Sequence, residues 1–380
     1  MATNRQAIIW KHIQLFILAT SFAAATGQEL CEECTCDTTL NGVKKLACQP
    51  VTKALEELIS QIPDEYGELE MRRGNFPTLT NYSFVSLNNL KRLVIDNCNV
   101  KTIEVGAFAS LKNLEELELK ANDFFTLPES VFEDLARLKK LTLADNLLTH
   151  LTTDIFVGLT NLEILDVERN FLEDISYDSF SSLTSLKQLM LNKNMISSLP
   201  STIFEFNQQL EEVHLNKNKL QELHPMTFNT TPLLQKVYLE ENKITTLSEQ
   251  LFVGNNEITV VSLTGNLFTC NCEMAGFRLW MELDETLKTA EVNGKCGSPD
   301  SLKGTDLLDV PHADLVCTTT TTTTTTAPTS TTTETLHTSF LNITSHSHDG
   351  SKWMHVDCVY LRSHQCSRTA HDVLEQKNTD

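Results

Sequence analysis

Apolar side chains recur along this chain at a constant interval. Leu138 follows Leu114 by the same number of residues as Leu162 follows Leu138. The stretch 114–122 reads Leu-Glu-Glu-Leu-Glu-Leu-Lys-Ala-Asn, with leucine at its first, fourth and sixth positions and asparagine at its ninth. The alternation around the fourth and sixth positions predicts a short strand with one apolar face. The unit occurs nine times in phase, beginning at Tyr66, Leu90, Leu114, Leu138, Leu162, Leu186, Leu210, Leu234 and Ile258.

Two further positions of the unit are almost constant. One holds phenylalanine in eight units, at Phe84, Phe108, Phe132, Phe156, Phe180, Phe204, Phe228 and Phe252. The ninth position is asparagine in seven units, whereas the first two carry Gly74 and Cys98. A single unit cannot bury its own apolar side, so the units must stack as turns of one coil. We expect the asparagines to form a hydrogen-bonded ladder and Cys98 to be a buried free thiol.

This pattern resembles the leucine-rich repeat, whose period is roughly 20 to 29 residues. The resemblance implies an α/β fold, a horseshoe-shaped solenoid with a parallel sheet on its concave face. The repeats are expected over residues 63–267.

Residues 1–27 are predicted to be a signal peptide. Arg5 and Lys11 precede an apolar run over residues 13–25 that ends in three alanines. We expect cleavage between about residues 25 and 28, which would deliver the chain to an oxidising compartment.

Eight of the eleven cysteines flank the repeats in two groups of four. A solenoid exposes apolar side chains at its open ends, so disulfide-stabilised caps are expected over residues 28–62 and 268–317. Cys31 and Cys34 alone would also suit a redox or zinc motif, but the secretory context favours disulfides. The spacing resembles the cysteine-rich flanking modules of extracellular leucine-rich repeat proteins. That resemblance implies the pairs Cys31–Cys36, Cys34–Cys48, Cys270–Cys296 and Cys272–Cys317.

The second cap carries one amphipathic segment. Residues 273–283 place Met274, Phe277, Trp280 and Met281 on one helical face. We predict that this helix covers the last repeat, with Trp280 in the core of the cap.

Beyond residue 317 the composition changes. Residues 318–345 are rich in threonine and predict a disordered, O-glycosylated stalk. The segment 346–380 has no predicted structure, and no membrane span or lipid-anchor signal is evident in it. Its Cys358 and Cys366 are predicted to pair with each other or to link chains into an oligomer. N-glycosylation sequences occur at Asn81, Asn229 and Asn342.

The net charge and the absence of certain motifs argue against several classes of function. Fifty acidic residues oppose thirty basic ones, giving a formal charge of -20, which argues against binding to nucleic acid or to anionic membranes. No catalytic, phosphate-binding or calcium-binding motif is present, so neither an enzyme nor a cofactor is predicted. Scattered histidines in the tail are interpreted as solvated rather than metal-binding.

The whole arrangement of signal peptide, caps, repeats and threonine-rich stalk resembles variable lymphocyte receptors and related cell-surface recognition proteins. The resemblance implies a secreted or cell-surface-associated protein that recognises an extracellular protein or glycan. A structural matrix or adhesion component is the alternative, and a hydrolytic enzyme on this scaffold is a third, less favoured reading.

The predicted binding surface lies on the concave face, at the third, fifth, seventh and eighth positions of the units. Met190, His214 and Tyr238 are not required there by repeat packing and are expected to face water as interface anchors. The simpler interpretation is that this face is merely solvated and binds no ligand. The alternative location of the binding site is the cap loop 284–295. The candidate residues at position five are Glu118, Asp166, Met190, His214 and Tyr238, and a basic strip at position eight comprises Arg169, Lys193 and Lys217.

Overall fold

The computed structural model describes residues 30–32, 34–283, 291–316, 343–348 and 351–356. The chain divides into two compact units, Met1–Thr318 and Thr319–Asp380.

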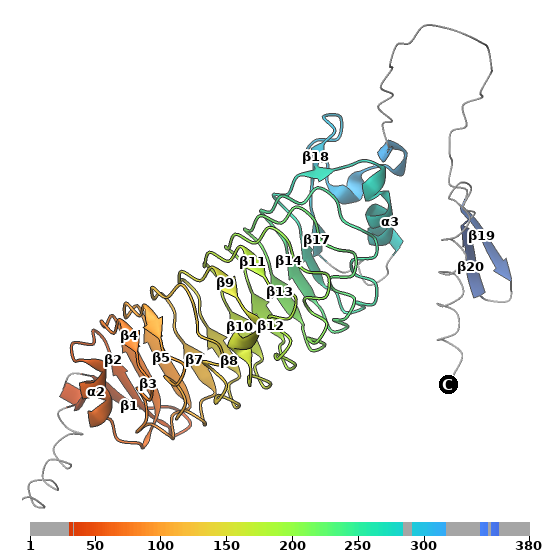
Figure 1. The fold of residues 1–380 in the computed structure, drawn as a ribbon. Coiled ribbons are helices and arrows are strands. Elements are labelled where there is room, and N and C mark those ends of the chain that lie inside the picture. Colours follow the sequence, from red (N-terminus) through yellow and green to blue (C-terminus); the bar gives the residue numbers. More distant parts are fainter. Residues whose placement is uncertain (1–29, 33, 284–290, 317–342, 349–350, 357–380) are drawn as a thin grey trace, which may run out of the picture. The chain divides into compact units, whose positions relative to one another are not determined.

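In the first unit the repeats stack as turns of a solenoid, and each adds one strand to a parallel sheet (Figure 1). Neighbouring strands pair at equivalent positions, so Leu117 aligns with Leu141 and Leu141 with Leu165. The register is fixed because a slip of one residue would turn the leucines out of the core. The repeat strands are β3 (Tyr66–Arg72), β5 (Arg92–Asp96), β7 (Glu116–Glu118), β8 (Lys140–Thr142), β10 (Ile164–Asp166), β12 (Gln188–Met190), β13 (Glu212–His214), β14 (Lys236–Tyr238) and β15 (Val260–Ser262).

Three strands outside the repeats complete a sheet of twelve. At one end β1 (Thr35–Thr38) pairs antiparallel with β2 (Lys44–Cys48), which runs parallel to β3. At the other end β17 (Glu291–Asn293) pairs in parallel with β15. The interpretation of residues 284–295 as a loop is therefore wrong for 291–293, which continue the concave sheet.

The phenylalanine column forms a stack through the core. Its ring centroids lie between 5.6 and 6.4 Å apart in six of the seven neighbouring pairs, in one run from Phe84 to Phe132 and a second from Phe156 to Phe252, and all eight rings are buried. Phe252 then meets the indole of Trp280 at 5.3 Å. Trp280 belongs to the cap helix, so the cap covers the end of this stack as predicted. The indole is only partly buried and packs against the core, so its predicted place within the core of the cap was wrong.

The asparagines form the expected ladder. Asn122 donates from Nδ2 to the carbonyls of Ile95 (2.8 Å) and Leu119 (3.1 Å), and its Oδ1 accepts from the amide of Cys98 (3.0 Å). Cys98 is free and buried, and it accepts from the amide of Gly74 at 3.4 Å. Burial raises the pKa of the Cys98 thiol to about 11, which leaves little thiolate at neutral pH.

The caps contain the helices. In the first, α2 (Leu55–Gln61) buries Leu55, Leu58 and Ile59. In the second, the 3₁₀ turn η2 (Cys272–Met274) leads into α3 (Ala275–Leu283), which buries Phe277 and Met281. The remaining cap elements are β16 (Phe268–Thr269), β18 (Cys296–Ser298), η4 (Leu307–Asp309) and η5 (His312–Asp314).

Disulfides stabilise both caps. Three bridges, Cys31–Cys36, Cys34–Cys48 and Cys270–Cys296, are the pairs that the family resemblance implies. Cys272 is also disulfide-bonded, and its expected partner Cys317 lies outside the described residues.

Short elements outside the large sheet complete the first unit. They are the parallel pairs β4 (Thr78–Leu79) with β6 (Thr102–Ile103) and β9 (His150–Leu151) with β11 (Asp174–Ile175), and the turn η1 (Thr153–Phe156).

The second unit contains an antiparallel pair, β19 (Ile343–His348) with β20 (Ser351–Val356). The stalk was predicted to be disordered up to residue 345, but residues 343–345 begin β19. The predicted signal peptide and the rest of the predicted stalk lie outside the described residues, as do Asn342, Cys358 and Cys366. No helix within the described ranges is both long and apolar enough to cross a bilayer.

Candidate functional site

The predicted position-five residues form one column across the concave face. Strand pairing aligns Asp166 with Met190, Met190 with His214, and His214 with Tyr238, on four neighbouring strands. Glu118 lies two strands before Asp166 in the same register. Like positions therefore lie about one strand spacing, roughly 4.8 Å, apart.

The column is less exposed than the sequence suggested. Met190, His214 and Tyr238 are half-buried, while Val94 in the same column is fully buried. At a spacing of about 4.8 Å, long side chains shield one another and any shorter neighbour. Met190, His214 and Tyr238 can therefore contact a ligand with only part of each side chain.

An ion-pair network occupies the N-terminal half of this face. Arg92 contacts the carboxylates of Glu70, Glu116 and Glu118, and Lys45 lies 2.8 Å from Glu70. Burial alone would raise the pKa of Glu70, but hydrogen bonds from Lys45 and Arg92 outweigh it and lower that pKa. Glu118 is therefore held by a neighbouring cation, which leaves it less available to a ligand.

Asp166 differs from these carboxylates because it has no ion pair among the described residues. It accepts the amide of Glu168 at 3.0 Å. Burial raises the pKa of Asp166, and the nearby charge of Glu168 adds to this effect. Asp166 is thus a poorly compensated acid in the middle of the column.

Two aromatic rings stand together towards the C-terminal end. His214 and Tyr238 stack with centroids 4.4 Å apart and planes inclined by 19°. Glu212 fixes the imidazole through His214 Nε2 at 2.7 Å and also lies 3.3 Å from Lys236. Burial raises the pKa of the Tyr238 phenol, and the charges of Glu212 and Glu240 raise it further. The pair forms a preorganised aromatic surface.

The basic strip lies after the strands, not on them. Its three residues have positive φ angles of 53°, 57° and 59°, so they occupy left-handed turn positions. Position eight was expected to present strand residues on the concave sheet, and its place in the turns shows that this expectation was wrong. Each basic side chain has an acidic partner: Arg169 with Asp145 (3.3 Å), Lys193 with Glu168 (2.6 Å) and Lys217 with Glu241 (3.2 Å).

Position seven was predicted to belong to the binding face, but the two acceptors that it holds were not singled out from the sequence. Asn216 Oδ1 and Glu240 Oε2 are shielded from solvent and have no hydrogen-bond partner among the described residues. The amide of Lys217 donates to the carbonyl of Glu240 at 2.8 Å, which places the two turns side by side. In the sequence, the one sign that Asn216 and Glu240 are neighbours is that both hold position seven of consecutive repeats.

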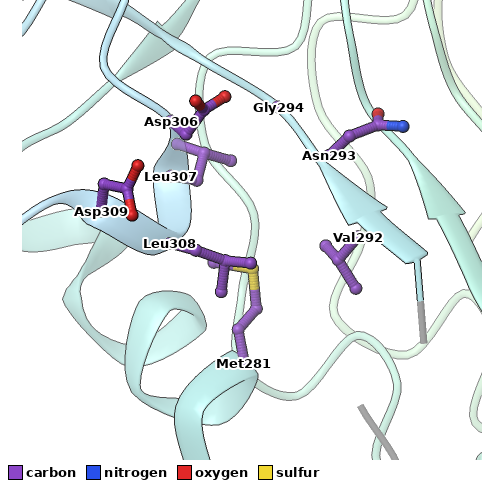
Figure 2. A pocket seen from close by; sticks show the side chains of 8 residues that line it. All are labelled: Met281, Val292, Asn293, Gly294, Asp306, Leu307, Leu308 and Asp309. Carbon is purple, nitrogen blue, oxygen red and sulfur yellow. The ribbon is translucent and has the colours of Figure 1, made fainter. Parts of the chain in front are cut away.

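A small pocket lies in the second cap, beside the last strand of the sheet. Figure 2 shows it between β17, the helix α3 with Met281, and the turn η4. Its volume is about 260 Å³, and its lining includes Val292, Leu307, Asp306 and Asp309. Asp306 pairs with Lys295 at 2.9 Å.

The two described glycosylation sequences have exposed asparagines, Asn81 and Asn229. At the second, Thr231 is buried and its hydroxyl donates to the carbonyl of Phe228 at 2.8 Å. Glycosylation at these sites remains a prediction. In the part of the chain that the structure describes, no cluster of three or more His, Cys, Asp or Glu residues is arranged to hold a metal.

Comparison with known proteins identifies the family. The sequence model of the leucine rich repeat matches residues 68–124, 88–148, 117–172, 136–196, 160–206 and 208–268. These matches span more than half of the chain, which therefore belongs to the leucine-rich repeat family.

Solved structures with this fold include proteins of several kinds. The TLR13–ssRNA13 complex aligns over 70% of this chain and 42% of that one, with 22% identity and a TM-score of 0.54. A leucine-rich repeat protein of Leptospira interrogans aligns over 64% of each chain, with 25% identity and a TM-score of 0.51. Human 5T4, also called Wnt-activated inhibitory factor 1 or trophoblast glycoprotein, aligns over 74% of this chain and 97% of that one, with 20% identity and a TM-score of 0.51. This chain thus spans less than half of the TLR13 chain that it matches.

Proposed function

We propose that this protein is an extracellular recognition protein that binds a protein or glycan ligand non-covalently through its concave face. One observation carries the proposal. Met190, His214 and Tyr238 stand in register on adjacent strands, half-exposed, on the face of the sheet that points away from the core. The core is complete without them, and clustered aromatic and methionine side chains are favoured interface anchors.

The disulfides support an extracellular location, because such bonds persist in oxidising compartments. The likeness to TLR13 and to 5T4 is consistent with a receptor-like role. The finer resemblance to variable lymphocyte receptors belongs to the same proposal.

The proposal is tested by capture from extracellular fluid on the immobilised secreted chain, followed by identification of the retained molecules. A specific protein or glycan that is displaced by soluble chain supports recognition. Retention of collagen and other matrix components would favour the alternative of a structural matrix or adhesion role. Absence of any saturable binding would contradict both.

A further inference from the structure

The charges near the C-terminal end of the concave face are unequally compensated. Among the basic side chains there, Lys236 lies 3.3 Å from Glu212, and Lys217 lies 3.2 Å from Glu241. In contrast, Glu240 and Glu291 have no ion pair among the residues that the structure describes. A ligand that approaches this end meets negative charge that the protein does not neutralise.

The aromatic pair lies within this acidic region. The ring centroids of His214 and Tyr238 are 4.4 Å apart, close to the strand spacing of roughly 4.8 Å, so the rings stack from strand to strand. The next aligned residue is Ser262, whose small side chain does not continue the stack. The face of an aromatic ring attracts cations.

The two unpartnered acceptors lie beside the rings. Glu240 follows Tyr238 by two residues, and Asn216 follows His214 by two, so all four side chains are on one side of the extended chain. Glu240 Oε2 and Asn216 Oδ1 both lack a donor among the described residues. A guanidinium group carries five N–H donors, no acceptor and a flat surface that stacks on aromatic rings.

We propose that His214, Tyr238, Asn216 and Glu240 form a subsite for an arginine side chain of the ligand. The inference rests on the proposed function, and it assigns that ligand to the class of basic proteins or peptides. The guanidinium stacks on Tyr238, and the side chains of Asn216 and Glu240 turn towards it so that their shielded oxygens accept its N–H groups. A lysine side chain matches the charge but not the flat shape, and citrulline matches the shape but not the charge.

The test uses the full secreted chain and three synthetic peptides, Ac-Gly-X-Gly-NH₂ with arginine, lysine or citrulline at X. Calorimetry gives the affinity, and saturation-transfer NMR reports which peptide protons touch the protein. We expect the arginine peptide to bind most tightly, through its side chain. Glu240→Gln should weaken it about ten-fold, the loss expected for one charged hydrogen bond. Glu257→Gln removes an exposed carboxylate of the next turn, at a position before its strand, and should change nothing.

Equal affinity for arginine and citrulline peptides, no binding of the arginine peptide at millimolar concentration, or full affinity in Glu240→Gln would each overturn the subsite. The affinity of Tyr238→Ala for the captured ligand distinguishes failure of the subsite from failure of the proposed function. If Tyr238→Ala weakens binding of the captured ligand while the peptides fail to bind, the concave face is the binding surface and the arginine subsite is wrong. If the captured ligand is unaffected, the proposed function fails as well.

Discussion

The indole of Trp280 stacks on the ring of Phe252 at 5.3 Å and thereby joins the cap helix to the phenylalanine stack of the repeats. We predict that Trp280→Ala lowers the free energy of unfolding by about 2 kcal/mol, less than for a fully buried tryptophan because Trp280 is partly exposed. Chemical denaturation measures this loss. Leu283→Ala, at an exposed position of the same helix, is the control and should cost little. Equal stability of the two variants would show that the stacking does not matter.

The asparagine ladder is predicted to be essential to stability. Asn146 Nδ2 donates to the carbonyls of Leu119, Leu143 and Ala144, and its Oδ1 accepts from the amide of Asn122. Asn146→Ala leaves buried backbone groups without partners, at a cost of roughly 1 to 3 kcal/mol each. The melting temperature should fall by several degrees at least.

A control for the ladder is Asn161→Ala, which removes one exposed hydrogen bond to Ala136. Its melting temperature should match that of the wild type. A comparable fall in both variants would mean that the effect is not specific to the ladder.

Cys98 gives the stability a predictable pH dependence. Burial raises the pKa of its thiol to about 11, from an ordinary value of 9.0. Between these values the unfolded state holds fewer protons than the folded state, so the free energy of unfolding falls as pH rises. Cys98→Asn, which introduces the usual ladder residue, removes this contribution. Above about pH 9 the free energy of unfolding of the wild type should therefore fall relative to that of the variant. A constant difference up to pH 11 would contradict the burial of the thiol.

The second cap should depend on its disulfides. The Cys270–Cys296 bridge closes a loop of 26 residues and is worth on the order of 2 to 4 kcal/mol. Its replacement by two serines also loosens the cover over the end of the core, so secretion should fall. The yield of secreted protein and its melting temperature measure this effect, and unchanged values would show that the cap folds without the bridge.

Much of the fold could be predicted from the sequence because each turn repeats one local rule. Leu117 and Leu119 define a strand, Asn122 defines the ladder, and Phe132 defines the stack. The strand β17 could not be predicted in this way. Glu291 pairs with Val260, and the step between them is longer than the repeat interval that joins Lys236 to Val260.

The candidate site was predicted only in part. The column of Met190, His214 and Tyr238 follows from the period, but their burial depends on how neighbouring side chains lie over one another. The pairing of Lys193 with Glu168 depends on side-chain positions that no repeat pattern contains. The same holds for Glu240 Oε2, which has no hydrogen-bond partner among the residues described.

The central claim is that Met190 and Tyr238 anchor a ligand on the concave face. Its most direct test is the dissociation constant of the captured ligand for the double variant Met190→Ala/Tyr238→Ala. The matched control is Tyr177→Ala/Met226→Ala, which removes the same two residue types from exposed positions outside the large sheet. We predict that the first variant binds at least about ten-fold more weakly and keeps its circular dichroism spectrum, while the control binds as the wild type does. Wild-type affinity in the first variant would contradict the claim.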